Sequence, residues 1–238
     1  MRVCFFMMLI QRSKERGSTK LDWLNSKHSF SFGDYYDPER LSFGKLLVVN
    51  DDIIKAGKGF GKHGHDNMEI ITLVIDGSLE HTDSMGNTGI ISEGEIQRMS
   101  AGTGVLHSEF SSSQGDSRIL QLWIEPNVLD IKPSYEQKKI SSSKNILHRI
   151  ASGKKIKDIV FLHQDAFLSF GTFDSGQKIL YSLENPSHGV FVFVVKGEIT
   201  LGKEKLKEGD SAEITQLDGL RFSSVVQSKI LVIEVPME

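Results

Sequence analysis

The 238-residue sequence has a single cysteine, an almost even balance of charge and no long hydrophobic run. Cys4 alone can form neither an intramolecular disulfide nor a cysteine-based zinc cluster, and such sparing use of cysteine is typical of a reducing compartment, so we expect a cytoplasmic protein. The 28 Lys and Arg residues against 31 Asp and Glu give a net charge of -3. The chain therefore lacks the excess of basic residues that is typical of direct nucleic-acid binding. Any bound metal must therefore be held by histidine and carboxylate.

The apolar N-terminal run, Met1–Ile10, is the segment that comes nearest to a signal peptide. It is too short to span a bilayer, and the charged stretch Gln11–Arg16 follows it where a small-residue cleavage site is required. We interpret the run as a buried first strand. No other stretch approaches about 18 consecutive apolar residues, so the sequence predicts neither a membrane span nor a membrane partner.

Short runs rich in Val, Ile and Phe alternate with clusters of Gly, Asn, Asp and Ser, which is an all-β pattern. Helical periodicity is scarce, and we expect only single helical turns within Gly17–Asn25 and Pro133–Lys139. The expected strands include Lys45–Asn50, Glu69–Ile75, Gly89–Ser92, Ile96–Met99, Leu120–Ile124, Val190–Val195, Glu198–Leu201 and Ile230–Val235.

The sequence contains a divergent internal repeat. The run Leu73–Leu79 resembles Phe193–Ile199, since each has an apolar strand, a charged residue, a glycine and a second strand. Downstream, Ile91–Ile96 resembles Leu206–Ser211. Two similar β units are implied, and the intervening segment is rich in Ser and Lys. We therefore expect a first domain over residues 1–131, a linker over 132–157 and a second domain over 158–238.

The eight histidines include two patterned groups. His63-Gly64-His65 places imidazoles at i and i+2, which share one face of a strand and can share one ion. His107-Ser108-Glu109 repeats that spacing with a carboxylate. Glu69 is a competing carboxylate, because it follows His65 by four residues and would share its face on an unbroken strand. The alternative for the whole set is histidines on the surface of a hairpin.

Three imidazoles and one carboxylate suit Fe(II), Mn, Ni, Cu(II) or Zn, and they leave coordination positions open, as a catalytic site requires. The repeat predicts that the second unit lacks this set. Shifting the ligands by the repeat offsets replaces them with Leu183, Asn185, Phe222 and Ser224. We therefore expect one metal ion per chain, bound in the first unit.

These residues resemble the cupin superfamily and, within it, the pirin family. The first cupin motif, Gly-x5-His-x-His-x3-Glu followed by a glycine, is matched by Gly57, His63, His65, Glu69 and Gly77. The second is matched by Gly102-x-Gly104-x2-His107, with Gly102 where proline is usual and Ser111 where asparagine is usual. Those departures are themselves pirin-like, as are the runs Trp23–Pro38 and Ser84–Glu109. The likeness also suggests that the family's usual start lies near Met7 or Met8.

The resemblance implies a bicupin, that is, two jelly-roll-type β-barrel domains with one divalent metal in the first. It implies His63, His65, His107 and Glu109 as the metal ligands, with Glu69 supporting them without touching the ion. Iron(II) is the first choice of metal, and Zn, Mn, Ni, Co and Cu are the alternatives.

Bacterial pirins with such motifs resemble quercetin 2,3-dioxygenases, which open a flavonol ring with dioxygen and release carbon monoxide. The implied partners are thus a small aromatic, flavonol-like substrate and dioxygen. We expect Glu109 also to act as the catalytic base that accepts the proton of the substrate's 3-hydroxyl group. The alternative is a non-enzymatic, iron-binding, redox-sensing regulator that binds a protein partner. A third reading is a cupin that holds a sugar or a small organic acid without chemistry.

Overall fold

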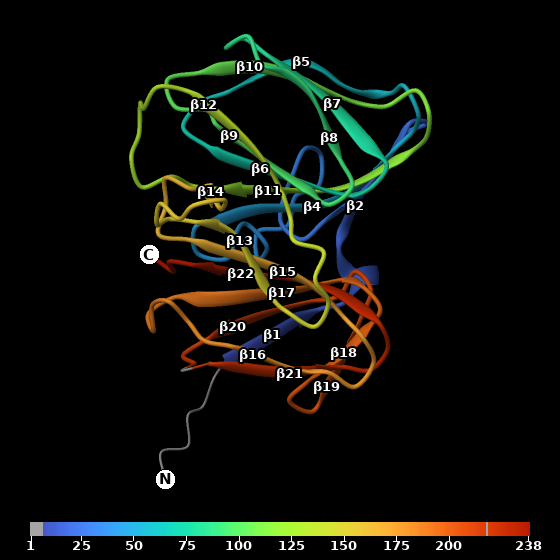
Figure 1. The fold of residues 1–238 in the computed structure, drawn as a ribbon, viewed down its shortest axis with the longest axis vertical. Coiled ribbons are helices and arrows are strands. Elements are labelled where there is room, and N and C mark those ends of the chain that lie inside the picture. Colours follow the sequence, from blue (N-terminus) through green and yellow to red (C-terminus); the bar gives the residue numbers. More distant parts are fainter. Residues whose placement is uncertain (1–6, 218) are drawn as a thin grey trace.

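A computed structural model describes residues 7–217 and 219–238, and it shows four stacked β-sheets that form two barrels (Figure 1). The described part of the chain contains no α-helix, only a three-residue 3-10 turn, η1 (Ser13–Glu15). No helix in those residues is long and apolar enough to cross a membrane. The predicted all-β fold with two similar barrels is confirmed, and strands cover all eight of the runs named above.

The first barrel consists of a seven-stranded and a four-stranded sheet. The larger has the order β12 (Ser134–Lys139), β9 (Glu95–Ser100), β6 (Glu69–Asp76), β11 (Ser117–Ile124), β4 (Leu46–Ile54), β3 (Leu24–His28) and β2 (Gly17–Lys20). The smaller has the order β5 (Gly59–His65), β10 (Val105–Ser111), β7 (Ser78–Asp83) and β8 (Thr88–Ser92).

The second barrel repeats this arrangement. Its larger sheet has the order β1 (Met7–Gln11), β20 (Ser211–Thr215), β17 (Gly189–Lys196), β22 (Ser228–Val235), β15 (Phe167–Phe173), β13 (His148–Ser152) and β14 (Val160–Phe161). Its smaller sheet has the order β16 (Lys178–Tyr181), β21 (Leu220–Ser224), β18 (Glu198–Leu201) and β19 (Glu204–Lys207).

The repeat read from the sequence corresponds to the turn that leads from the large sheet to the small one. Gly77 joins β6 to β7 with φ +75°, and Gly197 joins β17 to β18 with φ +91°. A Cβ atom at Gly77 would lie 2.6 Å from the carbonyl oxygen of Asp116. Both the backbone conformation and the space therefore require glycine at this corner of each barrel.

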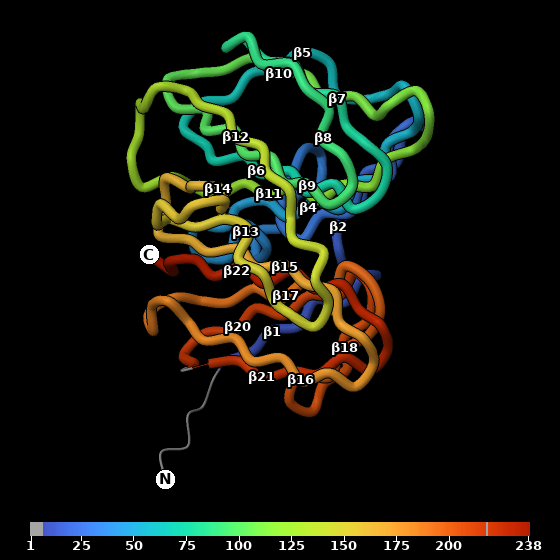
Figure 2. Tube along the Cα trace, in the orientation of Figure 1, coloured from blue at the N-terminus to red at the C-terminus, as the bar shows by residue number. Residues whose placement is uncertain are grey.

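Two segments expected to be loop or helix form strands instead. The helical turns predicted in Gly17–Asn25 and Pro133–Lys139 are wrong, because β2 pairs with β3 and β12 pairs with β9. The expected linker over 132–157 contains β12 and β13 and runs along the side of the molecule from one barrel to the other (Figure 2). Pairing with a strand at the edge of a sheet gives the backbone N–H and C=O groups of these segments hydrogen-bond partners, which their local sequence alone does not predict.

The strand at the start of the described chain lies in the second barrel. β1 pairs with β20, so the dark blue strand in Figure 1 lies among orange and red ones. It occupies the same edge position that β12 occupies in the first barrel. Strand pairing therefore places Met7–Gln11 in the second barrel, whereas the sequence analysis included these residues in a first domain over residues 1–131. Met7 and Leu9 face solvent, whereas Gln11 is buried, so the strand is only partly buried. The rest of the expected first strand, residues 1–6, lies outside the described residues.

The two large sheets pack face to face and form the largest apolar core. Alternate side chains of β6, namely Ile71, Leu73 and Ile75, meet Phe191 and Phe193 of β17 in this layer. Aligned packing of two such sheets buries one full face of each. The interface fixes the two barrels against each other, since an apolar contact of this extent resembles a domain core rather than a mobile domain boundary.

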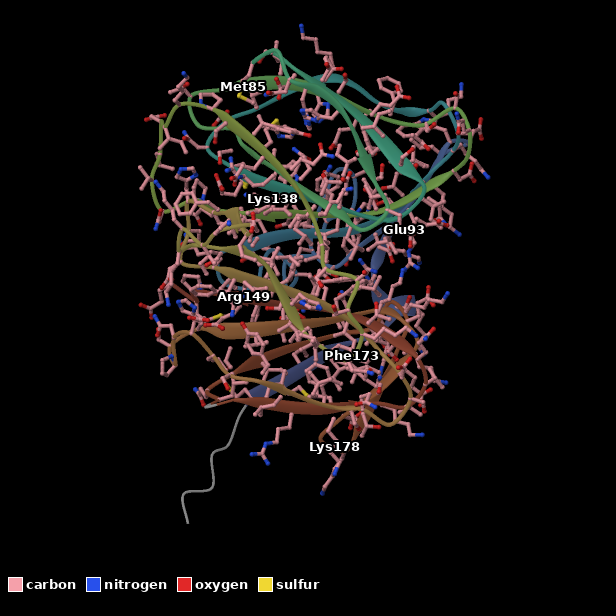
Figure 3. All side chains as sticks on the ribbon, viewed as in Figure 1. Met85, Glu93, Lys138, Arg149, Phe173 and Lys178 are labelled. Carbon is pink, nitrogen blue, oxygen red and sulfur yellow. The ribbon has the colours of Figure 1, made fainter. Side chains whose placement is uncertain are left out.

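The interiors of the two barrels differ. In the second, one continuous apolar cluster lies between the sheets, and Phe173, labelled in Figure 3, belongs to it. In the first, two smaller clusters lie at the ends. One contains Leu79 and Ile119, and the other contains Met99 and Val105. The middle of the first barrel is left for polar groups and a cavity.

Candidate metal centre

A cavity of about 490 Å³ opens within the first barrel, between its two sheets. Aromatic side chains form much of its wall, in particular Trp23, Phe32, Phe60 and Trp123. The rings pack on one another: Trp23 meets Phe60 edge to face at 5.3 Å between centroids, and Phe32 meets Trp123 at 5.4 Å. A volume and lining of this kind suit a planar ligand of several rings.

The three patterned histidines converge beside this cavity, which His63 and His65 line. His63 and His65 project from β5, and His107 projects from β10 directly opposite His63. One ring nitrogen from each lies within 4.8 Å of the other two. The ring centroids are 4.4 Å apart for His63 and His107, and 4.9 Å apart for His63 and His65. The i, i+2 spacing on an extended strand produces this convergence, as the sequence predicted.

The hydrogen bonds of these imidazoles fit a metal ion. His63 Nδ1 lies 2.7 Å from the carbonyl oxygen of Gly61, so Nδ1 carries the proton and Nε2 offers a lone pair. That Nε2 lies 3.0 Å from Nε2 of His107, and His107 Nδ1 is buried with no partner among the described residues. Burial, with the neighbouring imidazoles, lowers the pKa of His65 to about 4 and that of His107 to about 3. Neutral imidazoles are the form that ligates a metal.

Glu109 lies at the edge of this group. Its carboxyl oxygens accept hydrogen bonds from Gln121 Nε2 at 2.8 Å and from Thr72 Oγ1 at 3.3 Å. It approaches His107 within 4.8 Å, but it does not join His63 and His65 within that distance. Burial raises the pKa of Glu109 to about 7, so the carboxyl group can hold or release a proton near neutral pH. The role of Glu109 as a ligand and base therefore stays a prediction.

His81 is a buried neighbour that the sequence analysis did not single out. It lies on β7 opposite Glu109, and together with His107 and Glu109 it forms a second group of candidate ligands within 4.8 Å. Its Nε2 pairs with Asp83 at 3.1 Å, and Tyr135 packs on its ring. The alternation of buried and exposed residues along β7 is the signal that could have placed His81 inside.

Glu69 lies outside the site, because the strand that carries the histidines ends before it. β5 stops at His65, and Asn67 takes a left-handed φ of +44° before β6 begins. On β6, Glu69 shares the face of Ile71, which packs between the two barrels, whereas Thr72 faces the cavity side and reaches Glu109. The carboxylate accepts a hydrogen bond from the backbone NH of His163. The strand is therefore broken between His65 and Glu69, and Glu69 does not share a face with the histidines.

The equivalent positions of the second barrel can be fixed from matching hydrogen bonds. In the first barrel the backbone NH of Gly57 donates to the carbonyl oxygen of Ser111. In the second, Gly176 donates to Ser224 in the same way. Ser224 therefore corresponds to Ser111 and not, as the sequence offset suggested, to Glu109.

Counting back along the strands, Leu220 takes the place of His107 and Phe222 that of Glu109. Tyr181 lies opposite Leu220, as His63 lies opposite His107. All three residues of the second barrel are buried in its apolar cluster. The second barrel thus has apolar or aromatic side chains at these three ligand positions, and each of the three differs from the residue that the offsets selected for it.

A second set of polar side chains lines the cavity and was also missed from the sequence. It comprises Thr19, Ser26, His28, Asn50 and Asp52, which come from β2, β3 and β4. His28 entered the sequence analysis only within the pirin-like run Trp23–Pro38. Ser26 and His28 share one face of β3 at i and i+2, as Asn50 and Asp52 do on β4, but these pairs and Thr19 meet only when the three strands are paired.

Two stacked barrels, with three convergent imidazoles in a cavity of the first, define a bicupin with a candidate metal centre. The chain belongs to the pirin family of cupins, as the sequence motifs predicted. Residues 10–124 match the family model described as Pirin, and residues 149–235 match the model described as quercetinase C-terminal cupin domain.

Similar proteins cover nearly the whole chain. A relative from Escherichia coli (strain K12), named quercetin 2,3-dioxygenase, is 36% identical over 234 residues, which cover 97% of this chain and 99% of the relative. A relative from Zymomonas mobilis, provisionally named for the same activity, is 38% identical over 232 residues, covering 95% and 97% of the two chains. The crystal structure of the bacterial pirin YhhW from Escherichia coli in complex with nickel(II) superimposes with a TM-score of 0.92, at 35% identity, and the match covers 97% of this chain and 99% of that one.

Proposed function

We propose that the protein is a metal-dependent dioxygenase of the pirin type that opens the ring of a flavonol with dioxygen. The observation that supports this most directly is the meeting of three imidazoles with a buried carboxyl group of raised pKa at one aromatic-walled cavity. Relatives named quercetin 2,3-dioxygenase at 36% identity add to it.

His63, His65, His107 and Glu109 would hold one divalent ion. When bound, such an ion supplies Lewis acidity, which lowers the pKa of a hydroxyl group that reaches it, and redox chemistry toward dioxygen. We keep iron(II) as the first choice, and nickel(II) is tested beside it because a similar pirin was crystallised with nickel(II). Zn, Mn, Co and Cu are the further alternatives.

The chain's own groups would bind the flavonol and move its proton. The paired rings of Trp23 and Phe60, and of Phe32 and Trp123, would stack against a planar substrate and exclude water. A carboxylate oxygen of Glu109 would accept the proton of the 3-hydroxyl group. Gln121 donates to that carboxylate and fixes its direction.

The test is a turnover assay on protein loaded separately with each metal. Loss of the flavonol absorbance together with oxygen uptake and carbon monoxide release is the expected result. His107→Ala should abolish it, whereas Glu80→Gln, which changes an exposed residue of β7, should not. Absence of turnover with Fe, Mn, Ni, Co and Cu alike would refute the proposal.

The second candidate function is a metal-dependent regulator that binds a protein partner. It is favoured by the alternation along β10, which turns His107 inward and leaves Leu106 and Phe110 exposed on the outer face of the same strand. A change at the metal could thus alter the outer surface of β10, where Leu106 is the neighbour of His107 in sequence. Pull-down with and without reductant should then recover a redox-dependent companion. Efficient turnover with no such companion would remove this candidate. A cytoplasmic location is part of both proposals.

A further inference from the structure

The cavity face of the first barrel's large sheet carries a row of polar side chains across four strands. Thr72 on β6 pairs with Gln121 on β11, Gln121 pairs with Asn50 on β4, and Asn50 pairs with His28 on β3. Neighbouring strands lie about 4.8 Å apart, so the row spans roughly 10 Å from Gln121 to His28. Glu109 is bonded to the Gln121 end of it.

The far end of the row is buried and neutral. His28 Nδ1 lies 2.8 Å from Asn50 Oδ1, and because a carbonyl oxygen only accepts, the ring proton is on Nδ1. His28 Nε2 then accepts from the hydroxyl of Thr19 at 2.9 Å. Burial lowers the pKa of His28, which agrees with a neutral ring. The hydrogen bonds therefore fix the direction in which the Asn50 side chain points.

Asp52 adds an unfilled hydrogen-bonding position beside this row. Its side chain is buried, with a relative exposure of 2%, and it lines the cavity. Ser26 donates to Oδ1, while Oδ2 has no hydrogen-bond partner within residues 7–217 and 219–238. The amide nitrogen of Asn50 likewise has none in that part of the chain. Both atoms are open to the cavity rather than enclosed, so a hydroxyl group of a ligand that enters the cavity can bond to them.

Asp52 lies at a different level of the sheet from the ring that packs on His65, because Trp123 pairs with Val48, four residues before Asp52. Asp52 pairs with Ile119, which clusters with Trp23 and Phe60. Trp123, four residues further along β11, packs edge to face on His65 at 4.9 Å. Four residues of a strand extend about 13 Å, which is comparable to the length of a molecule of two or three fused or linked rings.

We propose that Asp52 and Asn50 form a second anchor, which binds a hydroxyl group at the end of a planar aromatic substrate that lies away from the three imidazoles. This deepens the proposed function and rests on it for the orientation of the ligand. The substrate class is then an aromatic molecule hydroxylated at both ends. One hydroxyl group lies toward the imidazoles and Glu109, and another exchanges hydrogen bonds with Asp52 Oδ2 and the Asn50 amide.

Binding can be measured without turnover, because both tryptophans of the protein line the cavity. The full chain, loaded with metal and kept without oxygen, is titrated with quercetin, which has hydroxyl groups on both ends, and with 3-hydroxyflavone, which has only the 3-hydroxyl group. Quenching of tryptophan fluorescence gives the Kd of each. We expect the wild type to bind quercetin about tenfold more tightly, the usual effect of one or two buried hydrogen bonds.

Asp52→Ala should weaken quercetin binding about tenfold and leave 3-hydroxyflavone within about twofold, so the preference disappears. Asp52→Asn, which keeps the shape and the Ser26 contact, replaces it if the alanine variant does not fold, and should reduce the preference about threefold. Glu80→Gln is the control, since it removes an exposed carboxylate and should leave both constants unchanged.

The outcomes separate the two proposals. Equal weakening of both ligands, or a wild type without preference, overturns the anchor, and turnover in that case leaves the dioxygenase proposal standing. Preferential binding that depends on Asp52, with no turnover on any metal, supports the anchor and refutes the dioxygenase. If neither compound quenches the tryptophans, the anchor is overturned for this class of ligand.

Discussion

The Nε2 atoms of His63 and His107 lie 3.0 Å apart across a single cross-strand pair of β5 and β10. Since the proton of His63 is on Nδ1, where Gly61 accepts it, the lone pair of its Nε2 faces the other ring. This arrangement leaves the two side chains ready to share a cation, and burial with the neighbouring imidazoles lowers the pKa of His107, which favours the neutral ring that a metal needs.

Metal content should depend on His107 and not on Glu69. His107→Ala removes one of three convergent nitrogens and should abolish stoichiometric metal as measured by elemental analysis. Glu69→Gln should retain it, because that carboxylate lies between the barrels beside Arg98 and the backbone of His163. Comparable metal loss in both variants would mean that Glu69 supports the site through contacts that its place on β6 does not suggest.

Removing the metal should lower stability. A ligand that binds only the folded state at about 100 times its Kd stabilises that state by roughly 2.7 kcal/mol. For a chain of this size, we expect a chelator to lower Tm by about 5 to 11 °C in differential scanning calorimetry. The His107→Ala variant should show no response to the chelator. A chelator-sensitive Tm in that variant would point to a metal held elsewhere.

Gln121→Leu should separate catalysis from metal binding. The amide of Gln121 donates to Glu109 Oε2 at 2.8 Å and accepts from the indole NH of Trp123 at 3.3 Å. Leucine has a similar volume but releases the carboxylate, so we expect kcat for flavonol turnover to fall about tenfold. KM and metal content should change little. An unchanged kcat would argue that the direction of the Glu109 carboxyl group does not limit the reaction.

Asp52 should make stability fall as pH rises. Burial raises its pKa from 3.8 to about 7, so the folded state favours the neutral carboxyl group. The stabilising contribution is fully present below pH 3.8 and is lost as pH rises through 7. Asp52→Asn removes the titration. The free energy of unfolding of the variant, relative to that of the wild type, should therefore rise by about 1 to 3 kcal/mol from pH 4.5 to pH 8, as measured by urea unfolding. A difference that does not vary with pH would indicate an ordinary, ionised Asp52.

The second barrel should tolerate change without loss of activity. Tyr181 donates to Glu234 Oε2 at 2.6 Å, and that fully buried carboxylate also accepts from the backbone NH groups of Glu184 and Asn185. Tyr181→Phe removes one donor and should cost about 1 to 3 kcal/mol of unfolding free energy in chemical denaturation. Metal content and turnover at 25 °C should stay at wild-type values. Loss of metal in this variant would show that the second barrel supports the first through their shared interface.

The sequence predicted what depends on local spacing and missed what depends on strand pairing. The histidine spacing on β5 and the repeated glycine corners at Gly77 and Gly197 follow from periodicity and backbone geometry alone. Glu69 stayed open as a competing carboxylate, because the break at Asn67 that sets its face cannot be read from periodicity. Asp52 was missed because its partner, Ser26, lies on another strand, and only the register of β3 against β4 brings the two together.

The exchange of edge strands has a consequence for how the chain reaches this structure. β1 is among the first described residues to leave the ribosome, yet Leu9 pairs with Glu213 on β20, which is among the last. The first barrel can close around its cavity while synthesis continues. β1, in contrast, has no strand to pair with until β20 has emerged near the other end of the chain. Pairing over so long a separation is slow to form. Assembly of β1 is thus the step at which a nascent chain, or a truncated one, exposes a sheet edge open to aggregation.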